Sequence, residues 1–161
     1  MGKAKIIREG KDITIVSSSY MTLEALRAAR ILAKDRINAE IIDLRTIKPI
    51  DEEVILDSIK KTGRLIVVDG AWRSFGTSAE ILALAAEKSY GLLKCAPTRI
   101  AFPDHPIPTS WSLANRFYPR AIDIVNATRK TFGLAEQTEE QLGIFYDIPL
   151  DVPDKTFIGP F

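Results

Sequence analysis

Short apolar runs alternate with helical stretches along this chain, and this alternation limits the fold more than any other feature. The clearest run is residues 64–69, RLIVVD, whose four central apolar residues indicate a strand covered on both faces. Strands are predicted at residues 13–16, 39–44, 64–69 and 97–102, and helices at residues 22–35, 51–61, 77–88 and 119–132. Strands and helices that alternate at this spacing predict an α/β domain: three layers, α/β/α, around a mostly parallel sheet of about five strands.

Residues at the predicted helix ends support this assignment. The hydroxyl of Thr22 is a candidate cap for the first helix, and Asp51 is a candidate N-cap for the second. The second helix also has acidic residues in its first turn and Lys60 and Lys61 in its last, which suits the helix dipole. Pro119 suits the first turn of the last helix.

The chain divides into a domain and a tail. Its 161 residues fit one domain with a short extension. Regular patterns stop at Gly133, residues 136–140 are polar, and residues 151–161 contain few signals of regular structure. We therefore expect a domain at residues 1–132 and a tail at residues 133–161 that packs on the domain or on a partner.

Composition excludes several classes of protein. The 22 Lys and Arg residues nearly balance the 21 Asp and Glu residues, so no charged field indicates a nucleic-acid partner. No apolar run approaches the ~20 residues that cross a bilayer, so no membrane partner is expected. A single cysteine, Cys95, and an N-terminus without an apolar signal segment predict a cytoplasmic protein.

No residue set in the sequence indicates catalysis or metal binding. The single histidine, His105, is interpreted as a loop residue in a proline-rich turn, with a general base oriented by Asp104 as the alternative. Cys95 is interpreted as packed and inert, because no second thiol or histidine lies near it in sequence. Since no nucleophile, base and oxyanion donor occur together, we predict neither catalytic nor metal-binding residues.

One loop has the position of an anion-binding site. Residues 70–78, GAWRSFGTS, follow the strongest strand and open a helix, so Arg73, Gly76 and Thr77 are candidates to hold an anion. The alternative is that two glycines bracket a loop whose Trp72 and Phe75 pack against a neighbour. The packing interpretation is favoured, because the loop lacks the dense N–H groups of a phosphate-binding loop.

Two sequence blocks together resemble a known domain family. The first comprises residues 39–51, AEIIDLRTIKPID, residues 60–69, KKTGRLIVVD, and residues 76–81, GTSAEI. It is similar to the C-terminal domain of the transketolase superfamily. The second block, residues 99–108, RIAFPDHPIP, resembles a proline-rich loop of the beta subunits of 2-oxo-acid dehydrogenases. The resemblance covers roughly residues 2–132, and a transketolase or 1-deoxyxylulose-5-phosphate synthase type of enzyme remains the alternative branch.

The resemblance carries expectations about function. In such enzymes thiamine diphosphate and Mg²⁺ are held by two other domains, so this domain is expected to bind no cofactor and to be inactive alone. It is expected to support a homodimer, to contact the enzyme's other domains or subunits, and to contribute to docking an acyltransferase core. Candidate docking residues are Trp72, Phe75 and the terminal Phe161, and the loop residues Trp111 and Phe117 are further apolar candidates for a covered surface. An anion-binding regulatory module is the alternative outside this family.

Overall fold

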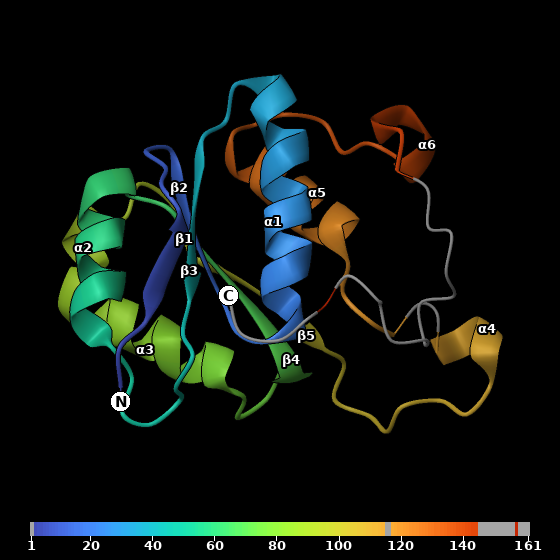
Figure 1. The fold of residues 1–161 in the computed structure, drawn as a ribbon, viewed down its shortest axis with the longest axis horizontal. Helices are drawn as coiled ribbons and strands as arrows, with labels where there is room; N and C mark the ends of the chain where they lie inside the picture. The colour runs from blue at the N-terminus through green and yellow to red at the C-terminus, as the bar shows by residue number, and fades with distance from the viewer. Residues whose placement is uncertain (1, 115–116, 145–156, 158–161) are drawn as a thin grey trace.

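The predicted three-layer α/β/α architecture is confirmed (Figure 1). The computed structural model describes residues 2–114, 117–144 and 157. The strands are β1 (Lys5–Arg8), β2 (Ile13–Ser17), β3 (Ala39–Asp43), β4 (Leu65–Trp72) and β5 (Thr98–Phe102). The helices are α1 (Tyr20–Leu32), α2 (Glu52–Thr62), α3 (Thr77–Ser89), α4 (Trp111–Ala114), α5 (Ala121–Thr131) and α6 (Glu139–Leu142), with 3₁₀ turns η1 (Ala33–Asp35) and η2 (Tyr90–Leu92).

The sheet has the order β1-β3-β2-β4-β5. The four strands β2 to β5 pair in parallel, whereas β1 runs antiparallel along β3, with Lys5 opposite Asp43. The sequence did not predict β1, because this edge strand is only partly buried and therefore lacks a continuous apolar run. The parallel strands place their carboxyl ends along one edge of the sheet, which is the lower rim in Figure 1.

Each face of the sheet has its own core. On one side, α1 and α5 cover a cluster that includes Ile15, Ile66 and Ile124. On the other side, α2 and α3 cover a cluster that includes Val16, Val67 and Ile81 (Figure 1). Adjacent residues on β2 and on β4 therefore point to opposite clusters, and this explains why these strands read as continuous apolar runs.

Two predicted helix caps differ in the structure. Helix α1 begins at Tyr20 after Ser19, and the buried Thr22 hydroxyl accepts a hydrogen bond from Ser17 Oγ at 3.0 Å instead of capping the helix. Asp51 does occupy the N-cap position of α2, but its side chain does not cap the helix. The carboxylate instead accepts the backbone N–H of Ala4 at 3.0 Å, so it ties the N-terminal segment to the start of α2.

A buried polar network joins β2, β3 and α2. The Glu40 carboxylate is fully buried and accepts hydrogen bonds from Gly10 N, Ser58 Oγ and Lys61 Nζ. Thr14 Oγ1 extends the network to Ser58 Oγ at 2.6 Å. Burial alone would raise the pKa of Glu40, but the hydrogen bonds outweigh it and hold the pKa below its ordinary value.

A second buried carboxylate fixes α5 to α1. Glu24 is fully buried, and it accepts the N–H of Ala121 at 2.7 Å and a hydrogen bond from Arg27 at 2.7 Å.

The chain after α5 continues to contact this side of the domain: Leu142 packs against the α1–α5 core, and Phe157 contacts Tyr20 edge-to-face. The division into domain and tail at residue 132 stays a prediction.

Candidate interaction surface at the carboxyl end of the sheet

Three loops form the rim at the carboxyl ends of β3, β4 and β5. They comprise residues 44–51, 73–76 and 103–110, and they lie along the lower edge of Figure 1. In open parallel sheets this edge is the usual place for a ligand or partner. The rim is therefore the first surface to search for function.

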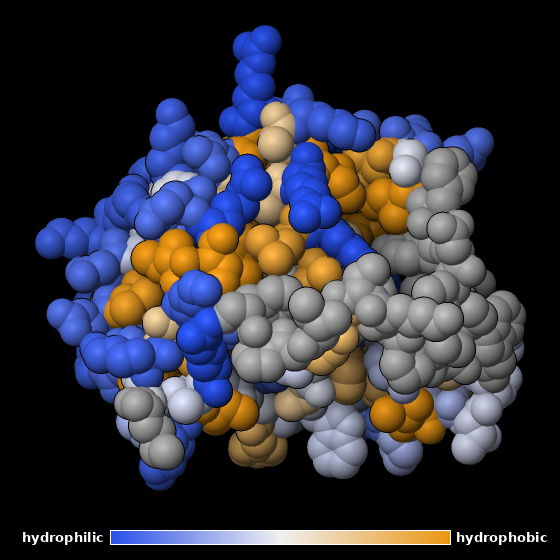
Figure 2. Space-filling view, viewed as in Figure 1, coloured by the Kyte–Doolittle hydropathy of each residue, from blue (hydrophilic) through white to orange (hydrophobic). Residues whose placement is uncertain are grey.

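Large apolar side chains gather on this rim. Nine large apolar side chains are exposed among the described residues, and five of them lie on these loops or on the elements that flank them: Ile47, Trp72, Phe75, Ile107 and Leu113. We call these five residues the apolar rim. Figure 2 shows pale and orange residues along the lower margin, whereas blue, hydrophilic residues crowd the left and upper margins. Exposed apolar side chains that gather on one edge mark interaction sites more often than singly scattered ones do.

The loop between β4 and α3 is held by the carboxylate of Asp69. Its Oδ1 accepts Ala71 N at 3.2 Å, and its Oδ2 accepts Ser78 N at 2.8 Å. Glycine is required at position 76, because a Cβ there would lie 2.4 Å from the Trp72 carbonyl oxygen and 2.9 Å from Asp69 Oδ2. The close approach of these backbone segments shapes the loop.

These contacts bear on the predicted anion site at Arg73, Gly76 and Thr77. The Asp69 carboxylate already lies at the start of α3, where an anion would bind, and like charges repel there. Arg73 donates from Nη1 to the carbonyl oxygen of Arg99 at 3.3 Å. Anion binding stays a prediction, and the internal contacts count against it.

A clamp joins this loop to the loop that follows β5. Ser74 donates its N–H to Asp104 Oδ1 at 2.8 Å and its hydroxyl to Asp104 Oδ2 at 2.7 Å. Arg99 Nη1 donates to the carbonyl oxygen of Arg73 at 2.9 Å, so each arginine side chain donates a hydrogen bond to the other's backbone. The hydrogen bonds from Ser74 hold the pKa of Asp104 below its ordinary value. The sequence gives no sign of this clamp, because Ser74 and Asp104 are 30 residues apart.

Two loop residues lie differently from the sequence-based expectation. The two Asp104 oxygens accept hydrogen bonds from Ser74, and His105 Nδ1 lies beside the Pro106 carbonyl oxygen, so these contacts do not support the alternative that Asp104 orients His105. His105 is exposed, with Nδ1 3.0 Å from its neighbour's carbonyl oxygen, as expected of a turn residue. Phe117, expected on the exposed surface, is buried, and its ring lies 5.1 Å from that of Phe102 between centroids. The side chain of Trp111 and all of Phe161 lie outside the described residues.

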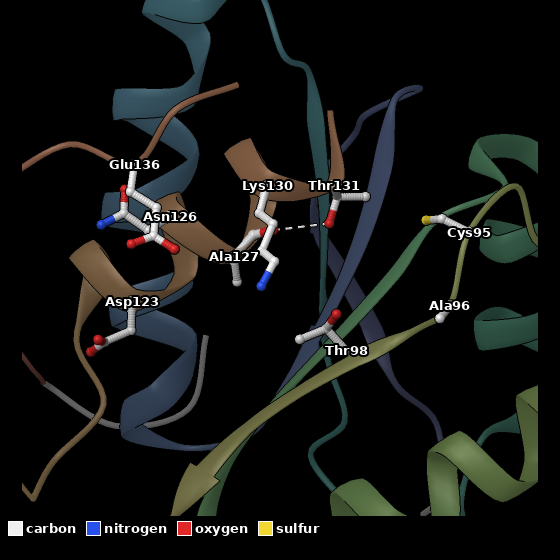
Figure 3. Close-up of a pocket in the computed structure, with 9 residues that line it drawn as sticks. All are labelled: Cys95, Ala96, Thr98, Asp123, Asn126, Ala127, Lys130, Thr131 and Glu136. Carbon is white, nitrogen blue, oxygen red and sulfur yellow. Dashed lines mark hydrogen bonds between the residues drawn. The ribbon is translucent and has the colours of Figure 1, made fainter. Parts of the chain in front are cut away.

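Apart from the rim, a hollow lies between β5 and α5. It has a volume of about 610 Å³, and the close-up in Figure 3 shows its lining from both elements. Cys95 is half-buried at its border, so the thiol is less enclosed than the expected packed cysteine. Lys130 extends from α5 toward the open space above Thr98, while Glu136, on the loop after α5, lies beside Asn126 (Figure 3). The remaining lining residues are Ala96, Asp123, Asn126, Ala127 and Thr131.

The expectation that this domain binds neither thiamine diphosphate nor its Mg²⁺ stays a prediction. Mg²⁺ bound to a diphosphate requires oxygen ligands from the protein, usually one or two carboxylates. Within residues 2–114, 117–144 and 157, no group of three or more His, Cys, Asp or Glu residues is arranged to hold a metal ion. The α3 start, where a diphosphate would find backbone N–H groups, is occupied by Asp69. We therefore derive no reaction step through this cofactor on this chain.

The model of the Transketolase, C-terminal domain family matches residues 2–124. The chain belongs to this family. The chain is 45% identical over 130 residues to "Pyruvate dehydrogenase E1 component subunit beta, mitochondrial" of Dictyostelium discoideum. The aligned region covers 81% of this chain and 36% of that relative. The chain is 42% identical over 130 residues to "Acetoin:2,6-dichlorophenolindophenol oxidoreductase subunit beta" of Cupriavidus necator, covering 81% of the chain and 38% of the relative.

A solved structure supports the same assignment. The chain matches "Split gene transketolase, inactive beta4 tetramer" with a TM-score of 0.71 and 28% identity, over 84% of this chain and 44% of that one. The chain spans well under half the length of the curated relatives it matches. Among the described residues, no helix is long and apolar enough to span a membrane.

Proposed function

We propose that this chain is the C-terminal scaffold domain of a thiamine-diphosphate-dependent 2-oxo-acid dehydrogenase beta subunit. The observation that carries the proposal is its 41–45% identity, over about four fifths of its length, to chains named as beta subunits of pyruvate dehydrogenase and of an acetoin oxidoreductase. The domain's role is assembly: it pairs beta subunits and supports the parts of the enzyme that hold the cofactor and perform the chemistry.

The apolar rim supports an assembly role. Large side chains such as Phe75 and Leu113 are exposed on one edge of the domain, and a partner that covers them gains free energy from their burial. The structural relative is described as an inactive tetramer of beta chains, so a related chain assembles with its own copies. We accordingly propose that this domain forms homo-oligomers and is inactive without the cofactor-binding part.

The test compares the chain alone with the complex that it forms. A tagged chain is purified from the cells that produce it, and 2-oxo-acid-dependent reduction of an electron-accepting dye is measured with thiamine diphosphate and Mg²⁺ supplied. We expect no turnover from the chain alone and turnover from a complex that contains a thiamine-diphosphate-binding polypeptide. Turnover by the chain alone contradicts the proposal, and so does the absence of such a polypeptide from every complex.

The substrate class is tested in the same assay. The similarity to a split-gene transketolase favours a ketose phosphate as the second candidate substrate. Complexes that transfer a two-carbon unit from a ketose phosphate, and that ignore pyruvate and branched 2-oxo acids, assign the domain to the transketolase branch. Docking of an acyltransferase core, and a cytoplasmic location, remain predictions, and the Dictyostelium relative is named as mitochondrial.

A further inference from the structure

We propose that the apolar rim is the face that docks this domain onto the cofactor-binding part of the enzyme, with Phe75 as its anchor. This inference rests on the proposed function and names the surface that performs it. The partner's chemistry is an apolar protein pocket large enough for a phenyl ring. Three lines of observation support this assignment: where the N-terminal segment lies, the state of Phe75, and the clamp beside it.

The N-terminal segment reaches the domain at the rim. Lys5 opens β1 opposite Asp43, at the carboxyl end of β3. Ala4 donates its N–H to Asp51, and Gly2 lies so close to Pro49 that an added Cβ would meet the proline Cγ at 2.7 Å. The curated relatives are more than twice as long as the matched region, and the matched family is a C-terminal domain. A polypeptide segment that precedes the domain in such longer chains therefore approaches from the rim, and we infer that the cofactor-binding part of the proposed enzyme lies next to it.

Phe75 has an unfavourable backbone conformation, and its side chain gains nothing from burial within this domain. Its side chain is fully exposed, and its φ of 59° lies in the left-handed region, which is unfavourable for a residue with a bulky side chain. Of the four non-glycine residues with positive φ in the described part of the chain, three lie on loops at this edge: Ser19, Arg45 and Phe75. Strained backbone of this kind concentrates at functional surfaces.

The clamp holds the backbone beside Phe75 in place in the absence of a partner. Asp104 accepts two hydrogen bonds from the adjacent Ser74, and Arg73 and Arg99 bond each other's backbone. The Asp104 carboxylate and Ser74 therefore have partners within the rim, so an apolar pocket can cover Phe75 while they keep these hydrogen bonds. An exposed aromatic side chain on a backbone segment that is already held in place has the properties of a binding hot spot, because docking must order the ring but not the loop that carries it. Asp104 is then a positioning residue for the anchor.

The test maps the contact directly. Photoreactive p-benzoylphenylalanine replaces Phe75 in the full chain, expressed in the cells that produce it, and mass spectrometry identifies the peptide crosslinked to it. The matched control places the same group at Tyr90, which is exposed at the opposite end of the sheet. In parallel, the affinity of each purified variant for the copurified thiamine-diphosphate-binding polypeptide is measured. Far-ultraviolet circular dichroism checks the fold of each variant.

We expect position 75, but not position 90, to crosslink to the thiamine-diphosphate-binding polypeptide. Phe75→Ala is expected to weaken that complex at least ~30-fold, and Tyr90→Ala less than ~3-fold. Asp104→Ala is expected to weaken it ~5-fold, whereas Asp104→Asn, which still accepts from Ser74, stays near wild type. A crosslink from position 75 to a second copy of this chain, or an unchanged affinity of Phe75→Ala, overturns the inference while leaving the proposed function intact. Failure of the wild-type chain to bind any such polypeptide overturns both.

Discussion

Replacing Glu40 by Gln tests the largest buried polar network of the domain. Gln keeps the size of the side chain, but its NH₂ group must face at least one of the three donors that now point at the carboxylate, namely Gly10 N, Ser58 Oγ and Lys61 Nζ. Hydrogen bonds to a charged group contribute about 1.5–3 kcal/mol each, and breaking a fully buried ion pair costs about 3–5 kcal/mol. The Lys61 side chain is 42% exposed and can turn to water, which lowers the cost. We therefore expect Glu40→Gln to lower the free energy of unfolding by about 2–3 kcal/mol.

The assay is urea unfolding followed by circular dichroism, with the slope of the transition required to stay unchanged. For a chain of this size the loss corresponds to a fall in Tm of about 4–12 °C. The matched control is Glu9→Gln, because Glu9 also contacts Lys61, at 3.3 Å, but is largely exposed, and we expect it to change stability by less than ~0.5 kcal/mol. If Glu40→Gln is as stable as wild type, the network does not stabilise the fold and the reasoning fails.

The difference in stability between wild type and Glu40→Gln should also depend on pH. The pKa of Glu40 in the folded state lies below the ordinary value of 4.5, so its contribution is fully present above pH 4.5 and is lost as the pH falls through the folded pKa. The stability difference between wild type and Glu40→Gln should therefore be constant near neutral pH and shrink in acid. A difference that grows as the pH falls contradicts the assigned sign.

Two further substitutions test close contacts that shape the fold. Gly10→Ala should destabilise by about 3 kcal/mol or more, because its Cβ would lie 2.2–2.3 Å from backbone atoms of β3, whereas Gly91→Ala, with open space around it, should change little; equal unfolding midpoints refute this. Asp69→Asn should cost about 1–2 kcal/mol, because the amide cannot accept both N–H groups, including that of Ser78, and loses its charge at the α3 start. The control Asp57→Asn, at an exposed position on α2, should stay within ~0.5 kcal/mol, and a loss equal to that of Asp69→Asn contradicts the cap.

The architecture was predictable because burial on both faces leaves a strong pattern. The runs that contain Ile15 and Val67 read as strands since every side chain of β2 and most of β4 are buried. The strand β1 was missed because it is an edge strand whose pairing is set by β3, and its alternation is interrupted by an irregularity in the register between Ile6 and Arg8. The helix caps were misjudged at Thr22 because burial in the α1 interface, rather than local sequence, decides where its hydroxyl points.

The candidate surface was only partly predictable. Trp72 and Phe75 stand out in sequence as aromatic residues in a glycine-bracketed loop, and both are exposed in the structure. The other members of the apolar rim look like ordinary loop residues until the parallel strands bring their loops together. Phe117 was misjudged for the converse reason, since its position in a proline-rich connection does not reveal that it packs between Phe102 and Tyr118. Contacts between residues far apart in the sequence determine whether these side chains are exposed or buried.

The central claim is that this domain supports a thiamine-diphosphate enzyme without itself holding the cofactor. The most direct measurement is a calorimetric titration of the purified chain with thiamine diphosphate in the presence of Mg²⁺. The account predicts no saturable heat up to millimolar cofactor, because no group of three or more His, Cys, Asp or Glu residues among the described residues could hold a metal ion and Asp69 occupies the start of α3. Saturable binding of one thiamine diphosphate per chain, with a micromolar Kd that requires Mg²⁺, would contradict it.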